Sequence, residues 1–154
     1  MATPSLRRAV PTDAERIAAI VERAYAPYVP RIGLRPGPMD ADHAQAVVQE
    51  EVWVAELDGV TVGLAVLHTD DDHLLLENVA VDPAYHGRGV GRVLLDLVET
   101  RAEQLGFDQV RLYTHALMTE NQRLYERRGY VETHREPEDG FNRVFYSKDL
   151  RRGP

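Results

Sequence analysis

The stretch LLLENVAVDPAYHGRGVGRVLLDLVETRAEQL, residues 74–105, decides the fold of this chain. Residues 74–81 form a mostly apolar run, typical of a buried strand, and residues 90–105 repeat apolar side chains at helical spacing. Between them lie Gly87, Gly89 and Gly91, which have no Cβ atoms to keep a ligand away from the backbone. Because the first N–H groups of the helix point to the same place, the stretch predicts an anion site there, suited to phosphate.

Two familiar phosphate-binding loops are excluded by the residues that follow these glycines. A P-loop needs Lys and then Ser or Thr after its last glycine, but Gly91 is followed by Arg92 and Val93. The dinucleotide fingerprint needs Gly-x-Gly-x-x-Gly, and Leu94 occupies its last position when counting starts at Gly89. Neither a γ-phosphate site nor a dinucleotide site is therefore expected.

The loop instead resembles the acyl-coenzyme A loop of the GNAT superfamily of N-acetyltransferases, usually written Gln/Arg-x-x-Gly-x-Gly/Ala, with His86, Gly89 and Gly91 at its defined positions. The flanking segments match as well, LENVAVDP at residues 76–83 and NQRLYERRGY at residues 121–130. This order of strand, loop and Tyr-x-x-x-Gly-Tyr is specific, whereas a glycine-rich loop alone is a weak signal. His86 departs from the family's Gln or Arg, although it can still donate a hydrogen bond.

The resemblance implies a fold, a reaction and a cosubstrate. The expected fold is α/β (α+β), a mixed, mostly antiparallel sheet of about seven strands flanked by about four helices, splayed between the fourth and fifth strands. One N-acetyltransferase domain is expected over residues 4–150. The implied activity is direct transfer of the acetyl group of acetyl-coenzyme A to a primary amine of a small molecule or peptide, without a metal. Homodimers are common in the family, and the sequence leaves the oligomeric state open.

A second function class, a catalytically weak acyl-coenzyme A sensor or regulatory module, stays open at this point. Retention of both Glu77 and Tyr125 favours the enzyme, because these match the positions of the family's general base and of the tyrosine that protonates the departing thiolate. Each also has a simpler interpretation, namely a strand Glu paired with an Arg across the sheet and a core tyrosine.

Composition excludes several other classes of protein. The 154 residues suit one domain, and 44% hydrophobic with 28% charged residues is typical of a soluble globular chain without a membrane segment. A net charge of -7 with scattered Lys and Arg argues against a nucleic-acid partner. The absence of cysteine excludes disulfides and thiol nucleophiles, and the first residues lack the apolar core of a secretory signal, so a cytoplasmic location is expected.

Hydrophobic periodicity predicts the remaining elements. Strands are expected over residues 6–10, 52–57, 62–68, 109–114, 130–135 and 141–148, the last two forming a hairpin around residues 137–140, and helices over residues 13–26, 40–50 and 119–128. We expect an N-cap at Thr12 or Asp13, and a capping box formed by Thr119 and Gln122. Asn78, a poor strand residue, suggests a β-bulge. The buried helical face after the loop is expected to comprise Val90, Leu94, Leu97, Val98, Ala102 and Leu105.

The resemblance also assigns coenzyme-binding residues, with an ordinary turn as the alternative. Backbone pairing with the coenzyme arm is expected at Val79, Ala80 and Val81, and pyrophosphate binding at His86, Gly87, Arg88, Gly89, Val90, Gly91 and Arg92. Asn121 lies one helical turn before Tyr125 and is a further candidate, although the family's commoner Asn position holds Met118 here.

A proline- and glycine-rich segment, residues 28–39, is expected to be irregular and to cover the acceptor. Tyr28, Arg31 and Arg35 are its candidate substrate residues, since a guanidinium can clamp a carboxylate bidentately. Solvated surface arginines are the equally good alternative. No metal site is expected, because residues 70–72 lack the ligand spacing of a calcium loop.

Overall fold

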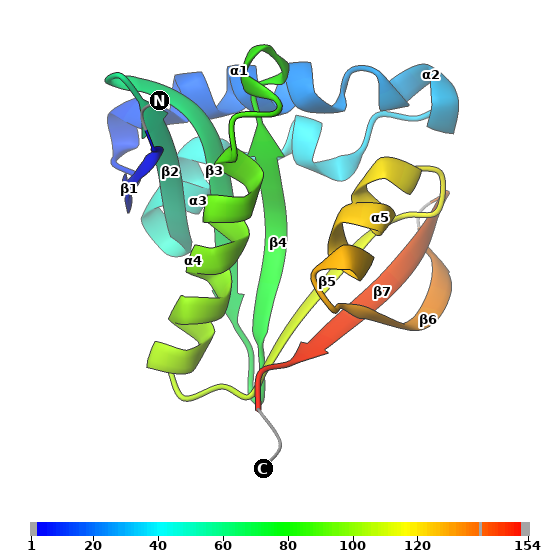
Figure 1. The fold of residues 1–154 in the computed structure, drawn as a ribbon. Coiled ribbons are helices and arrows are strands. Elements are labelled where there is room, and N and C mark those ends of the chain that lie inside the picture. The colour runs from blue at the N-terminus through cyan, green and yellow to red at the C-terminus, as the bar shows by residue number, and fades with distance from the viewer. Residues whose placement is uncertain (1–2, 139, 152–154) are drawn as a thin grey trace.

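The computed structural model describes residues 3–138 and 140–151, which form one sheet flanked by helices (Figure 1). The strands are β1 (Ser5–Arg8), β2 (Glu51–Leu57), β3 (Val60–Thr69), β4 (Leu74–Val81), β5 (Gln109–His115), β6 (Val131–Glu138) and β7 (Phe141–Asp149). The α-helices are α1 (Ala14–Tyr25), α2 (Tyr28–Ile32), α3 (His43–Gln49), α4 (Val90–Gln104) and α5 (Thr119–Arg127). Short 3-10 turns are η1 (Pro11–Asp13), η2 (Gly37–Asp40) and η3 (Pro83–Tyr85).

The sheet has the strand order β1-β2-β3-β4-β5-β7-β6, and the pair β4 and β5 is parallel while the others are antiparallel. A strand, helix and strand crossover through α4 produces that parallel pair. The ladder joins Leu74–Leu76 only to Val110–Leu112, and beyond it β4 and β5 diverge (Figure 1). The fold class expected from the sequence, including the splay, is confirmed.

A β-bulge in β4 changes which residues face which side of the sheet. Val66 pairs with Asn78 and Leu67 with Leu76, so Glu77 is the extra residue. Leu76 contributes to the core beneath α4, whereas Ala80 contributes to the core beneath α1, because the bulge reverses the alternation. The bulge predicted at Asn78 is confirmed, and it leaves Glu77 and Asn78 on the same face.

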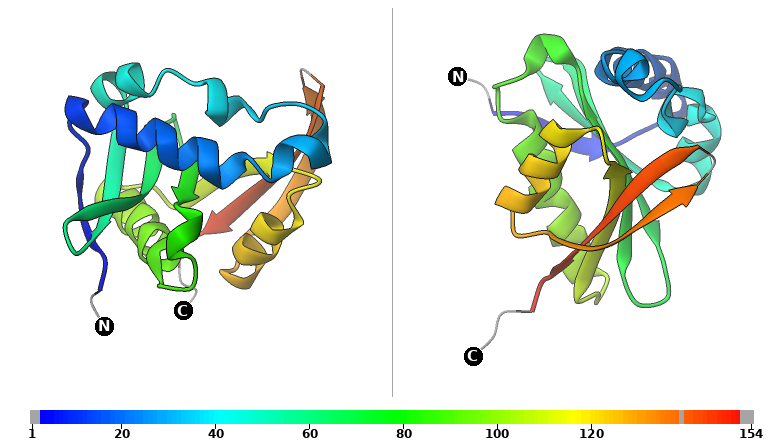
Figure 2. Two further views of the ribbon diagram at one scale, coloured as in Figure 1. Left: turned by 90° about the horizontal axis from the view of Figure 1, so that it is seen from above. Right: turned by 90° about the vertical axis from the view of Figure 1, so that its right-hand side faces the viewer.

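Helices α1 and α4 lie on opposite faces of the sheet (Figure 2), and a hydrophobic core lies beneath each of them. The larger packs α4 and Tyr125 against the sheet, and the smaller packs α1 against β2, β3 and β4. Gly63 lets β3 and α4 approach closely, since a Cβ there would lie 2.9 Å from Val90 Cγ1. In the part of the chain described, no helix is long and apolar enough to cross a bilayer.

Several local expectations are wrong, each for a physical reason. The segment expected to be irregular contains α2 and η2, since prolines are tolerated in the first turn of a helix. Asp13 is the N-cap residue of α1 as predicted, but its side chain does not cap the helix, because the carboxylate accepts hydrogen bonds from Val10 N–H and from Arg7. Gln122 bonds back to the carbonyls of His115 and Ala116 instead of completing a capping box.

The buried face of α4 also differs at three positions from the prediction. Leu95 is buried, Leu97 is partly exposed, and Leu105 is 39% exposed because the helix has already ended at Gln104. The final hairpin forms as expected, although Asp139 at its turn lies outside the described residues.

Candidate active site

A cleft of about 340 Å³ follows the loop between β4 and α4, and we call it the loop cleft. Its lining residues come from α1, α2, β4, the loop, α4, α5 and the residue before α5: Ala24, Tyr25, Tyr28, Val79, Ala80, Val81, Tyr85, His86, Gly87, Gly89, Val90, Gly91, Leu95, Met118, Asn121, Leu124 and Tyr125. Nine of the predicted coenzyme-binding residues are among them. Arg88 and Arg92 are not in this lining; the Arg88 guanidinium lies over the Tyr85 ring at 6.0 Å instead.

The anion end of the loop cleft is built by the start of α4. Gly89 adopts a left-handed conformation, φ +80°, at the N-cap, and its carbonyl accepts the first helical bond from Val93. The N–H groups of the first turn therefore point into the cleft without helical partners, and the helix dipole adds positive potential. This geometry suits a phosphate group.

Asp82, at the start of the loop, fixes the loop to α1. Its carboxylate is 1% exposed, accepts a hydrogen bond from Ala84 N–H at 3.0 Å and pairs with Arg16 and Arg23 of α1, each at 2.9 Å. Burial alone would raise the pKa of Asp82, but the Ala84 N–H and the two guanidinium groups outweigh it and lower the pKa. The loop is thus anchored to α1 by a charge that stays ionised.

The open edge of β4 forms the long wall of the loop cleft. Since β5 has diverged by Leu76, backbone groups of Val79 and Val81 face the gap instead of a neighbouring strand. An extended ligand arm can pair with such an edge as an added strand does.

A second hollow of about 350 Å³, which we call the inner cavity, lies beneath α3 and the segment that precedes it. Its walls combine aromatic and apolar side chains with two carboxylates: Tyr25, Ile32, Pro36, Gly37, Pro38, Ala41, His43, Ala46, Glu50, Val66, Leu76, Glu77, Asn78, Val79, Leu112, Tyr113, Thr114, His115, Met118, Asn121, Tyr125, Phe141 and Arg143. Such a mixture suits a small organic molecule that carries a cationic group.

The two hollows meet at five residues that line both of them, namely Tyr25, Val79, Met118, Asn121 and Tyr125. Tyr125 is only 5% exposed, and its ring packs edge-on against Tyr130 with centroids 6.0 Å apart. Burial raises the pKa of Tyr125, so its hydroxyl stays protonated at neutral pH. The ring is therefore part of the core, while the residue also borders the junction of both hollows.

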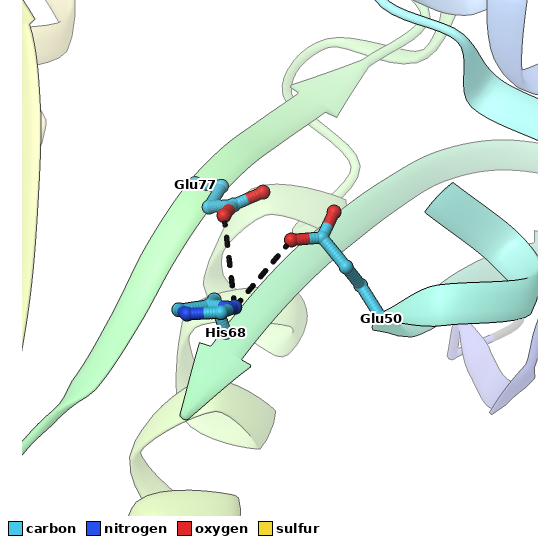
Figure 3. A group of neighbouring side chains, drawn as sticks. All are labelled: Glu50, His68 and Glu77. Carbon is cyan, nitrogen blue, oxygen red and sulfur yellow. Dashed lines mark ion pairs between the residues drawn. The ribbon is translucent and has the colours of Figure 1, made fainter. Parts of the chain in front are cut away.

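Glu77 and Glu50 lie close together on the inner-cavity wall, and His68 approaches both from β3 (Figure 3). His68 Nδ1 is 3.6 Å from Glu50 Oε1 and 4.0 Å from Glu77 Oε1. Burial, together with a hydrogen bond and charge repulsion from Glu50, raises the pKa of Glu77 to about 7. A carboxyl group with such a pKa can exchange a proton near neutral pH.

Residues 28–41, which we call the roof segment, cover the inner cavity. Tyr28 and Arg31 both bond to the Glu120 carboxylate at the start of α5, at 3.1 and 2.9 Å. Further along, a Cβ on Gly140 would lie 3.1 Å from Leu34 Cδ1, so Leu34 abuts the turn between β6 and β7. The roof segment thus contacts two elements on the far side of the splayed sheet.

The two arginines predicted to clamp a substrate are engaged elsewhere. Arg31 pairs with Glu120, and Arg35 pairs with Glu22 and Asp40 at 3.0 Å each. Tyr28 lines the loop cleft and not the inner cavity. Neither guanidinium is therefore placed to bind an acceptor carboxylate in the inner cavity.

Comparison with known proteins identifies the family. The model of the acetyltransferase (GNAT) family matches residues 17–130. This chain belongs to the GNAT family. The match includes α1, the bulged strand β4, the loop and α5, which together build the loop cleft of this GNAT domain.

Individual relatives agree with this assignment. The probable N-acetyltransferase camello of Xenopus tropicalis is 39% identical over 84 residues, which cover 53% of this chain and 38% of that protein. The chain thus spans well under two thirds of this relative. A GCN5-related N-acetyltransferase structure from Rhodopseudomonas palustris superimposes with a TM-score of 0.81 at 26% identity, covering 97% of this chain and 98% of that one. The structure of yncA from Salmonella typhimurium, with its cofactor acetyl-coenzyme A, shares the fold, with a TM-score of 0.71 at 20% identity over 99% of this chain and 97% of that one.

Several residues of the candidate site were not predicted from the sequence. Glu50 and His68 reach Glu77 from a helix end and a neighbouring strand, and nothing in their local sequence marks them. Tyr25 could have been found, because it follows Val21 by four positions and so continues the buried face of α1. Its hydroxyl donates to Asn78 Oδ1 at 2.8 Å, which fixes the bulge residue in place.

Proposed function

We propose that this GNAT protein transfers the acetyl group of acetyl-coenzyme A directly to the primary amine of a small molecule bound in the inner cavity. The observation that carries this proposal is the junction of the two hollows at Tyr125, with Glu77 on the wall of the inner cavity. A thioester arriving through the loop cleft and an amine in the inner cavity would meet there.

Coenzyme binding in the loop cleft is supported by its shape and its charge. The first turn of α4 suits the pyrophosphate, and the open edge of β4 at Val79 and Val81 suits the amide groups of the pantetheine arm. Asn121 borders the junction and would bond to the inner end of that arm. His86 also lines the cleft, so the departure from the family pattern leaves a hydrogen-bonding group in place.

Glu77 and Tyr125 would divide the proton transfers. An ammonium group gives a proton to Glu77, and the free amine then forms a C–N bond with the thioester carbonyl carbon. The C–S bond breaks, the electron pair goes to sulfur, and the Tyr125 hydroxyl donates its proton there. A second proton from the nitrogen then returns to the Tyr125 oxygen. Each turnover therefore yields an amide and a free thiol, and the proton held by Glu77 goes to solvent.

A small acceptor is favoured over a protein side chain by the roof segment. Its contacts with Glu120 and with Gly140 cover the inner cavity from two sides. The carboxylates of Glu50 and Glu77 favour a cation, while Tyr25, Tyr113 and Phe141 favour an apolar body. A primary amine on an aromatic or apolar group matches both features. A cytoplasmic location and a homodimer remain predictions from the sequence and the family.

The experiment that tests this function is an acceptor screen. The purified protein is given acetyl-coenzyme A and a panel of amines, including aromatic amines, polyamines, amino acids and peptides, and free thiol and acetylated product are measured. We expect stoichiometric thiol and amide with small apolar amines. If acetyl-coenzyme A only raises the melting temperature and no amine releases thiol, the protein is a sensor module and the proposed function is wrong.

A further inference from the structure

The group Glu50, His68 and Glu77 lies beside the reaction site but is larger than a single general base requires (Figure 3). Its members come from the C-cap of α3, from β3 and from the bulge of β4. One ligand atom from each lies within 4.8 Å of the others. Leu76 packs on the α4 side of the sheet, so Glu77 faces the other side, the same side as His68, and the bulge adds Asn78 to that side.

The group connects the inner cavity with solvent. Glu50 and Glu77 line the cavity wall, and their side chains are 23% and 32% exposed. The His68 side chain is 50% exposed and lies behind them, outside the lining of the cavity. The three side chains therefore extend from the cavity wall to the surface.

Other titratable or charged groups face the same cavity from the elements around it. They are Tyr25 from α1, His43 from α3, Tyr113 and His115 from β5, Tyr125 from α5 and Arg143 from β7. Arg143 pairs with Glu138 at 2.8 Å, and its guanidinium lies over the Tyr113 ring at 4.6 Å. Glu50 is thus the carboxylate that shares this wall with Glu77.

We propose that Glu50, His68 and Glu77 form a proton relay in which Glu77 takes the ammonium proton, Glu50 positions Glu77, and His68 passes the proton to solvent. This inference rests on the proposed function. The relay carries the one proton that each turnover must release, from nitrogen to the Glu77 carboxylate, then to imidazole nitrogen, then to water. Imidazole suits the last step because one ring nitrogen can accept a proton while the other donates one.

The raised pKa of Glu77, about 7, agrees with this arrangement. Two carboxylates that share a site cannot both ionise easily, so Glu50 keeps Glu77 a better base than an exposed glutamate. A base whose pKa lies near the working pH is the most effective one.

The first test replaces Glu50 by Gln, which keeps the hydrogen bond and removes the charge. We expect the acid limb of the kcat/KM profile to move to lower pH by about one unit, with a matching fall of the Glu77 pKa in a carboxyl NMR titration. Glu56, whose side chain is 25% exposed and pairs with Arg7, is the matched control. Glu56→Gln should leave both the acid limb of the kcat/KM profile and the Glu77 pKa unchanged. An unmoved profile in Glu50→Gln would overturn the positioning role.

The second test replaces His68 by Gln and adds imidazole to the buffer. We expect kcat to fall about 10- to 100-fold, with substantial recovery in imidazole, because a diffusible base replaces the lost side chain. His134 on β6 is equally exposed, at 50%, and His134→Gln is the control that should show neither effect. A normal kcat in His68→Gln, or a loss that imidazole does not relieve, would contradict the relay.

A metal ion is the competing explanation for two carboxylates and an imidazole in contact. Treatment of the wild-type protein with a strong chelator should leave its activity intact. Loss of activity that zinc restores would replace the relay by a metal site.

Failure of the proposed function and failure of the relay give different results. If the wild-type protein shows no amine-dependent thiol release, the proposed function is wrong. If the wild-type protein releases thiol and the Glu50 and His68 variants behave as it does, only the relay is wrong. The NMR titration reports on the Glu50 and Glu77 coupling in either case.

Discussion

Among single residues, Glu77 depends most on its surroundings. Partial burial and the neighbouring Glu50 raise its pKa to about 7. Glu77 is the extra residue of the β4 bulge and lies on the face of the sheet opposite to Leu76. The alternative considered from the sequence is a strand glutamate that pairs with an arginine across the sheet. The described structure gives it His68 and Glu50 as neighbours in place of an arginine.

The raised pKa of Glu77 predicts a pH-dependent stability. A carboxyl group whose pKa is higher in the folded state stabilises the fold fully below its unfolded pKa of about 4.5, and this contribution is lost as pH rises through about 7. Glu77→Gln removes the effect, so we expect the variant to gain on the order of 1 kcal/mol relative to wild type at pH 8 but little at pH 5. Urea unfolding at both pH values measures this. Identical pH dependence in the two proteins would contradict it.

For Tyr125 the prediction separates catalysis from packing. Tyr125→Phe keeps the ring, which packs on Tyr130 and Tyr146, and deletes only the hydroxyl. Since that hydroxyl would stabilise charge that develops late in the reaction, we expect kcat to fall roughly 10²- to 10⁴-fold with near-normal coenzyme affinity. A lower melting temperature with an intact kcat would assign the hydroxyl a structural role instead.

At the scale of elements, the site depends on how β3, β4 and α4 are joined. The loop between β4 and α4 is held by Asp82, and α4 approaches β3 at Gly63. These two contacts keep the first turn of α4 beside the open edge of β4. Two glycine substitutions test the two halves of this arrangement.

Gly91→Glu tests the anion site. A Cβ on Gly91 would lie 3.9 Å from Val81 Cγ2, an ordinary contact, so the backbone itself tolerates a side chain there. We expect Gly91→Glu to weaken coenzyme A binding about 100-fold or more by placing a negative charge in the loop cleft, while Gly91→Ala binds much better than this. Calorimetry with coenzyme A measures both. Equal affinities for the Glu variant and the wild type would remove the pyrophosphate from this loop.

Gly63→Ala tests the packing of β3 on α4. The added methyl group would meet Val90 Cγ1 at 2.9 Å and the Ala80 carbonyl oxygen at 3.1 Å, so strand or helix must shift. We expect a loss of about 1–3 kcal/mol of unfolding free energy. Gly37, where a Cβ would meet nothing within 4 Å, is the control. A Gly63→Ala variant as stable as Gly37→Ala would contradict this packing account.

At the scale of the whole molecule, the roof segment joins the two halves of the splayed sheet. Arg31 of this segment bonds to Glu120, which lies 89 positions later in the chain. Leu34 contacts the hairpin of β6 and β7 at Gly140. This bridging would restrict which acceptors reach the inner cavity.

Arg31→Ala should therefore change acceptor choice more than stability. The ion pair with Glu120 is exposed on both sides, so its loss should cost less than about 1 kcal/mol. We expect kcat/KM to fall a few-fold for small amines and to rise for peptide amines as the roof segment loosens. Arg135→Ala, which removes an exposed pair with Glu132 on β6, is the control and should change neither. An unchanged small-amine to peptide ratio would mean that this bridge does not control access.

The parts of the fold and of the candidate site that the sequence predicts are those marked by a local pattern of residues. The strand, loop and helix around Gly89 were read correctly because periodicity and glycine spacing are local properties of the chain. The short α2 and the pairing of Arg31 were not, since Glu120 stabilises them from a distant part of the sequence. Glu50 and His68 come close to Glu77 through the C-cap of α3 and the pairing of β3 with β4, which no local pattern encodes.

The pH dependence of amine-stimulated thiol release tests the central claim most directly. Initial rates with acetyl-coenzyme A and the best amine of the screen are measured between pH 5.5 and 9.5 for the wild type and for Glu77→Gln. We predict that wild-type kcat/KM falls below an apparent pKa of about 7, the value of Glu77, and that Glu77→Gln loses this limb together with most of the rate. A Glu77→Gln protein with the wild-type rate and the same acid limb would contradict the account.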